Sequence, residues 1–227
     1  SSLILAEAMK GHGNVVIGNT FSKENRVVRP VAVIAEAVSR YGYLEKIIDP
    51  DFVIRRSYLL RPYENSAQFE SSFPLELTAA MSGPERENSA KFDRGLGLVT
   101  VGSPPLSVPV DGDGSYVINF TALESDFKEI PAWQAAQGKL DPSLVRGKTV
   151  LVGLTSALFA DRHPTPLGVL SGNAIHANEL LSIVAGRNLY FVSGGFVFTF
   201  SWILGSTVLV FFLFQRLWAG ILVFAVV

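Results

Sequence analysis

Apolar residues are distributed unevenly along this chain of 227 residues. Residues 190–214 contain no charged side chain, and after Gln215 and Arg216 a second apolar run occupies residues 217–227. A helix over residues 190–214 rises about 37 Å, which is enough to cross a hydrocarbon core about 30 Å thick. The pattern predicts a transmembrane helix at 190–214 and the start of a second at 217–227, truncated here and continuing in a longer protein.

Residues 1–189 instead contain short apolar runs separated by turn residues. Spacing and capping residues predict helices at 3–10, 30–38, 72–82, 130–137 and 173–185. Runs rich in β-branched and aromatic residues predict strands at 14–19, 43–45, 54–60, 96–101, 116–120 and 149–153. Residues 43–45 and 54–60 are expected to pair, and Pro164 and Pro166 indicate a loop after the last strand. The order favours a mixed α/β or α+β sheet.

The run at 149–153, Thr-Val-Leu-Val-Gly, is typical of a strand covered on both faces. Polar side chains follow it, and ligands usually bind at the carboxyl ends of strands in open α/β sheets. We therefore expect any ligand to contact residues there and on the helix at 173–185. The candidate ligand-binding residues are Thr155, Ser156, Asp161, Arg162, His163, His176 and Asn178.

The net charge and the cysteine content argue against several classes of function. The whole chain carries a net charge of −1 and Arg216 is the only charged side chain after residue 189, so residues 1–189 carry −2. Without a cluster of lysine and arginine, we expect no binding to nucleic acid. The absence of cysteine excludes thiol catalysis, disulfide scaffolds and cysteine-based zinc sites. The first ten residues lack the pattern of a signal peptide, so we expect further protein upstream.

Catalytic interpretations of the candidate residues fit poorly. The segment around Ser156 lacks the Gly-x-Ser-x-Gly elbow of a serine hydrolase, and Gly147-Lys148-Thr149 precedes the expected strand, where a phosphate loop follows one. A metal site built from Asp161, His163 and His176 has no recognised ligand spacing. We expect no catalytic residue, metal or cofactor. For His176 a hydrogen-bonded core position is favoured over a ligand contact, and Asp161 and Arg162 are expected to pair or to cap the loop.

Several segments resemble a known family, the second-type CHASE domain, a sensory extracellular domain associated with cyclases and histidine kinases. They are Gly-Lys-Thr-Val-Leu-Val-Gly-Leu-Thr at 147–155, Asp161 with Thr165-Pro166, Gly172 with Ile175-His176-Ala177-Asn178, and Gly186-Arg187-Asn188-Leu189. The family usually continues from such a tail into membrane helices. Its usual N-terminal segment has no counterpart here, so the resemblance implies that residues 1–189 lack the first part of the domain.

The resemblance implies the extracytoplasmic sensory input domain of a bacterial membrane receptor in the cell inner membrane, with residues 1–189 periplasmic or extracellular. Arg216 between the expected spans favours the same orientation, because short basic loops prefer the cytoplasm. The implied receptor binds an unknown extracellular ligand and dimerises through its full length. Its output module, beyond residue 227, is a nucleotide cyclase, histidine kinase, Ser/Thr kinase or diguanylate cyclase.

The polar tail before the membrane is the expected signal transmitter: Gly186, Arg187, Leu189 and Tyr190. This fragment itself is not expected to be an enzyme. Two alternatives stay open: a membrane-anchored periplasmic enzyme that uses Asp161 with His163 or His176, and a dimerisation module without a ligand.

Overall fold

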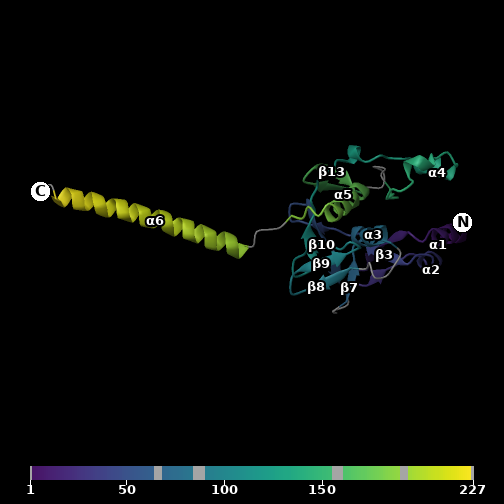
Figure 1. Ribbon diagram of the computed structural model, residues 1–227, viewed down its shortest axis with the longest axis horizontal. Helices are drawn as coiled ribbons and strands as arrows, with labels where there is room; N and C mark the ends of the chain where they lie inside the picture. Colours follow the sequence, from purple (N-terminus) through teal and green to yellow (C-terminus); the bar gives the residue numbers. More distant parts are fainter. Residues whose placement is uncertain (1, 64–67, 84–89, 155–160, 190–193, 226–227) are drawn as a thin grey trace. The chain divides into compact units, whose positions relative to one another are not determined.

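The computed structural model describes residues 2–63, 68–83, 90–154, 161–189 and 194–225. The chain divides into two compact units, Ser1–Leu189 and Tyr190–Val227, and each is considered by itself. The first unit contains short helices and several small sheets, which confirms the mixed α+β class (Figure 1).

The helices of the first unit are short. In chain order they are α1 Ser2–His12, α2 Ala32–Ala35, α3 Phe73–Met81, α4 Ala132–Ala136 and α5 Gly172–Val184, with single 3₁₀ turns at Glu124–Asp126 and Pro142–Leu144. The expected helix at 30–38 is reduced to α2, since the apolar β-branched side chains there give it little helical propensity.

Within the described residues the strands form five small sheets, and non-consecutive strands pair in two of them, β1 with β3 and β5 with β11. β1 (Val16–Phe21) pairs with β2 (Val27–Val28) and in parallel with β3 (Arg40–Tyr43). The other sheets are β4 (Ile47–Ile48), β5 (Ile54–Tyr58) and β11 (Ser115–Val117); β6 (Leu60–Pro62) and β7 (Phe69–Ser71); β8 (Lys91–Asp93), β9 (Leu98–Val101) and β10 (Leu106–Pro109); and β12 (Arg162–Thr165) and β13 (Gly168–Ser171).

Two helices form the centre of the domain. α3 contacts α5, β1 and β3, while α5 also contacts β10 and β13 (Figure 1). Both helices start within one residue of the predicted positions, where Ser72 and Ser171 accept hydrogen bonds from backbone N–H groups of the first turn. Their apolar faces meet in one core, which includes Ile54, Leu59, Leu75, Val99, Val101, Val108, Ile118, Ile175 and Ile183.

The prediction of a buried strand at 149–153 is wrong. Residues 149–154 form no strand, and the side chains of Val150 and Val152 are 52% and 87% exposed. A run of β-branched residues suits a pleated, half-buried surface, but it forms a strand only when another strand pairs with it. Among the described residues, no strand pairs with residues 149–153. The candidate residues that follow it therefore do not lie at a sheet edge formed by this run.

The predicted loop at Pro164 and Pro166 and the predicted pairing of residues 43–45 with 54–60 are also wrong. The expected loop at Pro164 and Pro166 is the hairpin β12–β13, in which Pro164 opposes Val169. Tyr43 belongs to β3 and pairs with Asn19 of β1, so the antiparallel partner of β5 on that side is β4. The β12–β13 hairpin tolerates Pro164 because each strand of a two-stranded sheet has an outer edge, and a proline whose nitrogen faces that edge loses no hydrogen bond between the strands.

The second unit contains α6, Gly194–Ala225, and its segment Gly195–Arg216 is long and apolar enough to cross a membrane. The apolar side chains of this segment are largely exposed, as suits contact with lipid. The helix continues through Gln215 and Arg216, where the sequence suggested a break between two spans. A glutamine and an arginine are both good helix formers, so the backbone need not break there. The number of spans stays a prediction.

Gly42 allows β3 and α3 to approach each other unusually closely. A Cβ atom at this position would lie 2.3 Å from Cα and 2.5 Å from N of Phe73. These are backbone atoms at the start of α3, which cannot move aside as a flexible side chain could. We infer that glycine at this position fixes the distance between the β1–β3 sheet and α3.

Gly42→Ala is expected to lower the free energy of unfolding by about 1–3 kcal/mol or more, because it overpacks a backbone contact. The measurement is denaturant unfolding of the full chain in detergent. Gly112→Ala is the matched control, since its Cβ would meet no atom within 4 Å. Equal stabilities of the two variants would contradict the close-packing argument.

Candidate functional site

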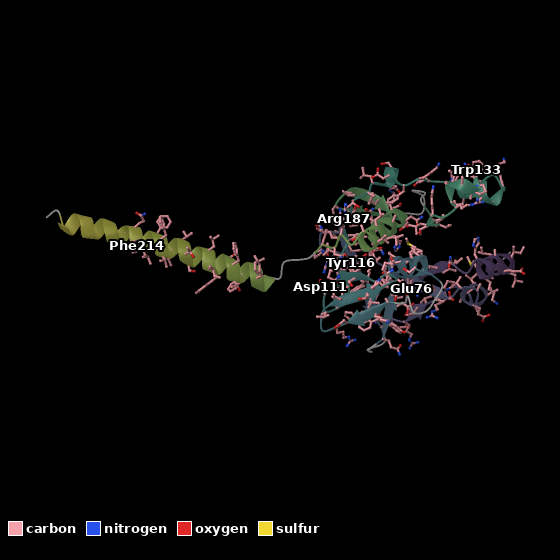
Figure 2. The ribbon with its side chains drawn as sticks, viewed as in Figure 1. Glu76, Asp111, Tyr116, Trp133, Arg187 and Phe214 are labelled. Carbon is pink, nitrogen blue, oxygen red and sulfur yellow. The ribbon has the colours of Figure 1, made fainter. Side chains whose placement is uncertain are left out.

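Four polar side chains from three segments meet inside the first unit. They are Lys46 between β3 and β4, Tyr116 on β11 (labelled in Figure 2), and His176 and Glu179 on α5. Lys46 Nζ lies 2.6 Å from Glu179 Oε2 and 3.1 Å from His176 Nδ1. His176 Nδ1 lies 3.1 Å from the same Glu179 oxygen, and the Tyr116 hydroxyl donates to Glu179 Oε1 at 3.3 Å. We call these four residues the buried charge cluster.

The cluster is almost completely removed from solvent. The side chains of Lys46 and Glu179 are 7% and 0% exposed. His176 is also buried, and the ring of Phe73 on α3 packs against it edge to face with centroids 5.3 Å apart. His176 and Glu179 are three residues apart on α5 and so share one face of the helix. This confirms the interpretation of His176 as a hydrogen-bonded core group.

Burial and the mutual charges set the protonation of the cluster. Burial alone raises the pKa of Glu179, but the Lys46 ammonium and His176 outweigh it and bring this pKa to about 2. Burial lowers the pKa of Lys46 despite the attraction of Glu179. Burial and the Lys46 charge lower the pKa of His176. Near neutral pH the cluster is thus a Lys46–Glu179 ion pair beside an uncharged imidazole.

Asn178 connects α5 to the segment that follows β11. Its Oδ1 accepts hydrogen bonds from the backbone N–H groups of Thr121 and Ala122, both at 3.0 Å. Its Nδ2 donates to the carbonyls of Ala122 and Ala174, both at 2.9 Å. The amide is fully buried, and all of these bonds go to backbone. This geometry gives Asn178 a structural role; contact with a ligand stays a prediction.

Asp161, Arg162 and His163 lie at the β12–β13 hairpin. Arg162 donates to Glu124 Oε2 at 2.9 Å and to the carbonyl of Val169 at 3.0 Å, so its ionic partner is not Asp161. The Asp161 carboxylate contacts His163 Nε2 at 3.2 Å, in a part-exposed pair. Arg162 also borders a hollow of about 410 Å³.

The structure divides the candidate residues into groups. His176 is in the buried charge cluster, Asn178 binds backbone, and the hairpin residues Asp161, Arg162 and His163 are partly exposed. Thr155 and Ser156 lie outside the described residues. Whether any of them contacts a ligand stays a prediction.

Residues 186–189, which follow α5, contact the rest of the first unit. Gly186 ends the helix with a φ of +61°, a conformation that glycine adopts without strain. The carbonyl of Arg187 accepts from Asn119 Nδ2 at 2.9 Å, and Asn188 Nδ2 donates to the carbonyl of Ser107 at 3.3 Å. Leu189 forms an antiparallel bridge with Val117 at the end of β11. We call residues 186–189 the exit segment.

A model of the CHASE2 domain family matches residues 2–214, which is most of the chain. The chain belongs to the CHASE2 family. CHASE2 domains are sensory extracellular domains found in signalling proteins, and they are not catalytic. Searches of the curated proteins and of the solved structures gave no match.

The family assignment agrees with the resemblance carried by the residues from Gly147 to Leu189. The match extends beyond the first unit of the CHASE2 protein into the apolar helix α6. The sensory domain and the candidate membrane helix therefore belong to one family pattern.

Sequence reasoning missed three members of the buried charge cluster, Lys46, Tyr116 and Glu179. One signal was present for Glu179, since an acidic residue three positions after His176 shares its face of an apolar helix. No local signal exists for Lys46, which lies 130 residues before His176. Among the described residues, no group of three or more His, Asp or Glu side chains has the geometry to hold a metal ion.

The ion pair leads to a prediction with an internal control. Glu179→Leu leaves the Lys46 ammonium buried without its carboxylate and is expected to lower the free energy of unfolding by about 3–5 kcal/mol. Adding Lys46→Met removes that uncompensated charge and is expected to restore most of the loss. Denaturant unfolding at neutral pH measures both. A double variant as unstable as Glu179→Leu alone would contradict the electrostatic explanation.

The same double variant tests the pH dependence. Because the folded-state pKa of Glu179 is depressed to about 2 from its ordinary 4.5, its stabilising contribution is complete above 4.5 and is lost as the pH falls toward 2. As the pH falls from 4.5 toward 2, the natural chain loses this contribution and the double variant does not. The free energy of unfolding of the double variant, relative to that of the natural chain, should therefore rise as the pH falls through this interval. A constant difference across it would show that Glu179 titrates normally.

Proposed function

We propose that this chain is the extracytoplasmic sensory input part of a bacterial signal-transduction protein in the inner membrane. Residues 1–189 are on the periplasmic or extracellular side, and the receptor works as a homodimer. The output module is a nucleotide cyclase, a histidine kinase, a Ser/Thr kinase or a diguanylate cyclase encoded beyond residue 227.

One observation carries the proposal: the core of a CHASE2 domain continues through a hydrogen-bonded exit segment toward an apolar helix. α5 connects the buried charge cluster with Gly186, and Arg187 to Leu189 contact residues at β10 and β11. A rearrangement around α5 therefore acts on the chain that leads to Gly195–Arg216. A signal can shift such an equilibrium only by its differential affinity for the two arrangements.

The absence of native cysteine allows a clean test of sidedness. Ser125→Cys places a thiol at an exposed position of the first unit. A membrane-impermeant maleimide is expected to label this variant in intact spheroplasts, to the same extent as after permeabilisation.

Ser57→Cys is the matched control, because Ser57 is 0% exposed and its cysteine should react only after denaturation. Labelling of Ser125→Cys that requires permeabilisation would place the domain in the cytoplasm and refute the proposed location.

Transmission through the exit segment can be tested in the complete receptor. Insertion of one alanine after Gly195, within α6, turns the rest of that helix by about 100° about its axis, whereas four alanines bring it back to within about 40°. We expect the single insertion to change the output activity more than the fourfold insertion does. Output that is unchanged by the single insertion would contradict direct helical transmission.

A further inference from the structure

In the buried charge cluster, Nδ1 of His176 is close to both a hydrogen-bond donor and a hydrogen-bond acceptor, and it can bond to only one of them in each protonation state. His176 Nδ1 lies 3.1 Å from Lys46 Nζ and 3.1 Å from Glu179 Oε2. An ammonium group only donates hydrogen bonds and an ionised carboxylate only accepts them. Nδ1 therefore either accepts from Lys46 or donates to Glu179.

The neutral imidazole fits the cluster when its proton is on Nε2. Lys46 then donates both to Glu179 and to the lone pair of Nδ1, and no donor faces another donor. Protonation places a hydrogen on Nδ1 as well, only 3.1 Å from the ammonium nitrogen. Two cations then compete for one carboxylate, and His176 becomes a hydrogen-bond partner for Glu179 in place of Lys46.

The surroundings of His176 determine how easily this proton is taken up. Burial and Lys46 lower its pKa, whereas Glu179 and Asp161 raise it, and the net direction is downward from 6.5. Tyr116 on β11 donates to Glu179, and Tyr43 on β3 is uncharged because burial raises its pKa well above 10.0.

Among the described residues, α3, β10 and β13, which also pack on α5, contribute no unpaired charge next to the ring. α3 presents the ring of Phe73, and its Glu76 is paired with Arg40 at 3.1 Å. β10 and β13 contain no titratable side chain.

We propose that the proton is a signal for this domain: protonation of His176 at Nδ1 displaces the Lys46 ammonium from Glu179 and loosens the connection between α5 and the β3–β4 segment. This inference rests on the proposed sensory function and specifies the regulation of the same domain. The helix that this change affects is α5, and the exit segment begins at Gly186, directly after the C-terminal cap of that helix. Acidification outside the membrane thus changes the contacts of the helix that leads out of the domain.

The first test follows the titration of His176 itself. The full chain with isotope-labelled histidine, in nanodiscs, gives one ring signal for each of its three histidines, and His176→Asn identifies the one concerned. Removal of the ammonium by Lys46→Met should raise the titration midpoint of His176 by about 1–3 units. An unchanged midpoint would show that Lys46 does not oppose this proton and would overturn the proposal.

The second test follows the movement. Spin labels at Ile48→Cys on β4 and Leu181→Cys on α5, both exposed positions, report the distance across the cluster. As the pH falls through the titration midpoint of His176, we expect this distance to shift by about 2–5 Å. His176→Asn keeps an acceptor for Lys46 but takes up no proton, so it should abolish the shift. His12→Asn, on the exposed face of α1, should leave the shift unchanged.

Two outcomes would overturn the proposal. One is a distance that stays constant while His176 titrates in the folded chain. The other is proton uptake that occurs only together with loss of the far-ultraviolet circular dichroism signal, which would make the cluster purely a stability element. Neither outcome affects the labelling and insertion experiments, so failure of the proton signal is distinguishable from failure of the sensory function.

Discussion

The ion pair between Lys46 and Glu179 constrains the rest of the sensory domain. An ammonium and a carboxylate lose most of their hydration inside a protein, and their attraction compensates only when the geometry is good and the remaining hydrogen bonds are made. Here the carboxylate also accepts from Tyr116, and the ammonium has a second partner in His176 Nδ1. The β3–β4 segment, β11 and α5 must therefore keep their relative positions for the pair to remain favourable.

α5 is the element on which most of these requirements meet. Ser171 caps its start, and its apolar side chains Ile175 and Ile183 enter the core. Asn178, between them, supplies hydrogen bonds to backbone groups near Ala122 that would otherwise be buried without partners. Apolar contacts stabilise α5 but are not directional, so they do not fix its rotation about its own axis. The hydrogen bonds of the Asn178 amide and the Lys46–Glu179 ion pair are directional and are satisfied at only one rotation.

The sequence was most informative where local chemistry decides the structure. The capping serines and the terminal glycine of α5 are local signals, so α3 and α5 lie close to their expected positions. Strand formation depends on partners that are often distant in sequence. For this reason the run at 149–153 forms no strand although its composition predicts one, and Tyr43 pairs with β1 instead of β5. The buried position of His176 was predictable from its helix, but Lys46, its charged neighbour, was not.

The bridge between Leu189 and Val117 bears on how force enters the domain. A load applied to the chain at residue 190 is not carried by the end of α5 alone. It is shared at once with β11 through that bridge, and with Asn119 and the carbonyl of Ser107 through side-chain amides. The domain is thus held at its exit by several parallel attachments, so the end of the helix is protected from fraying under tension.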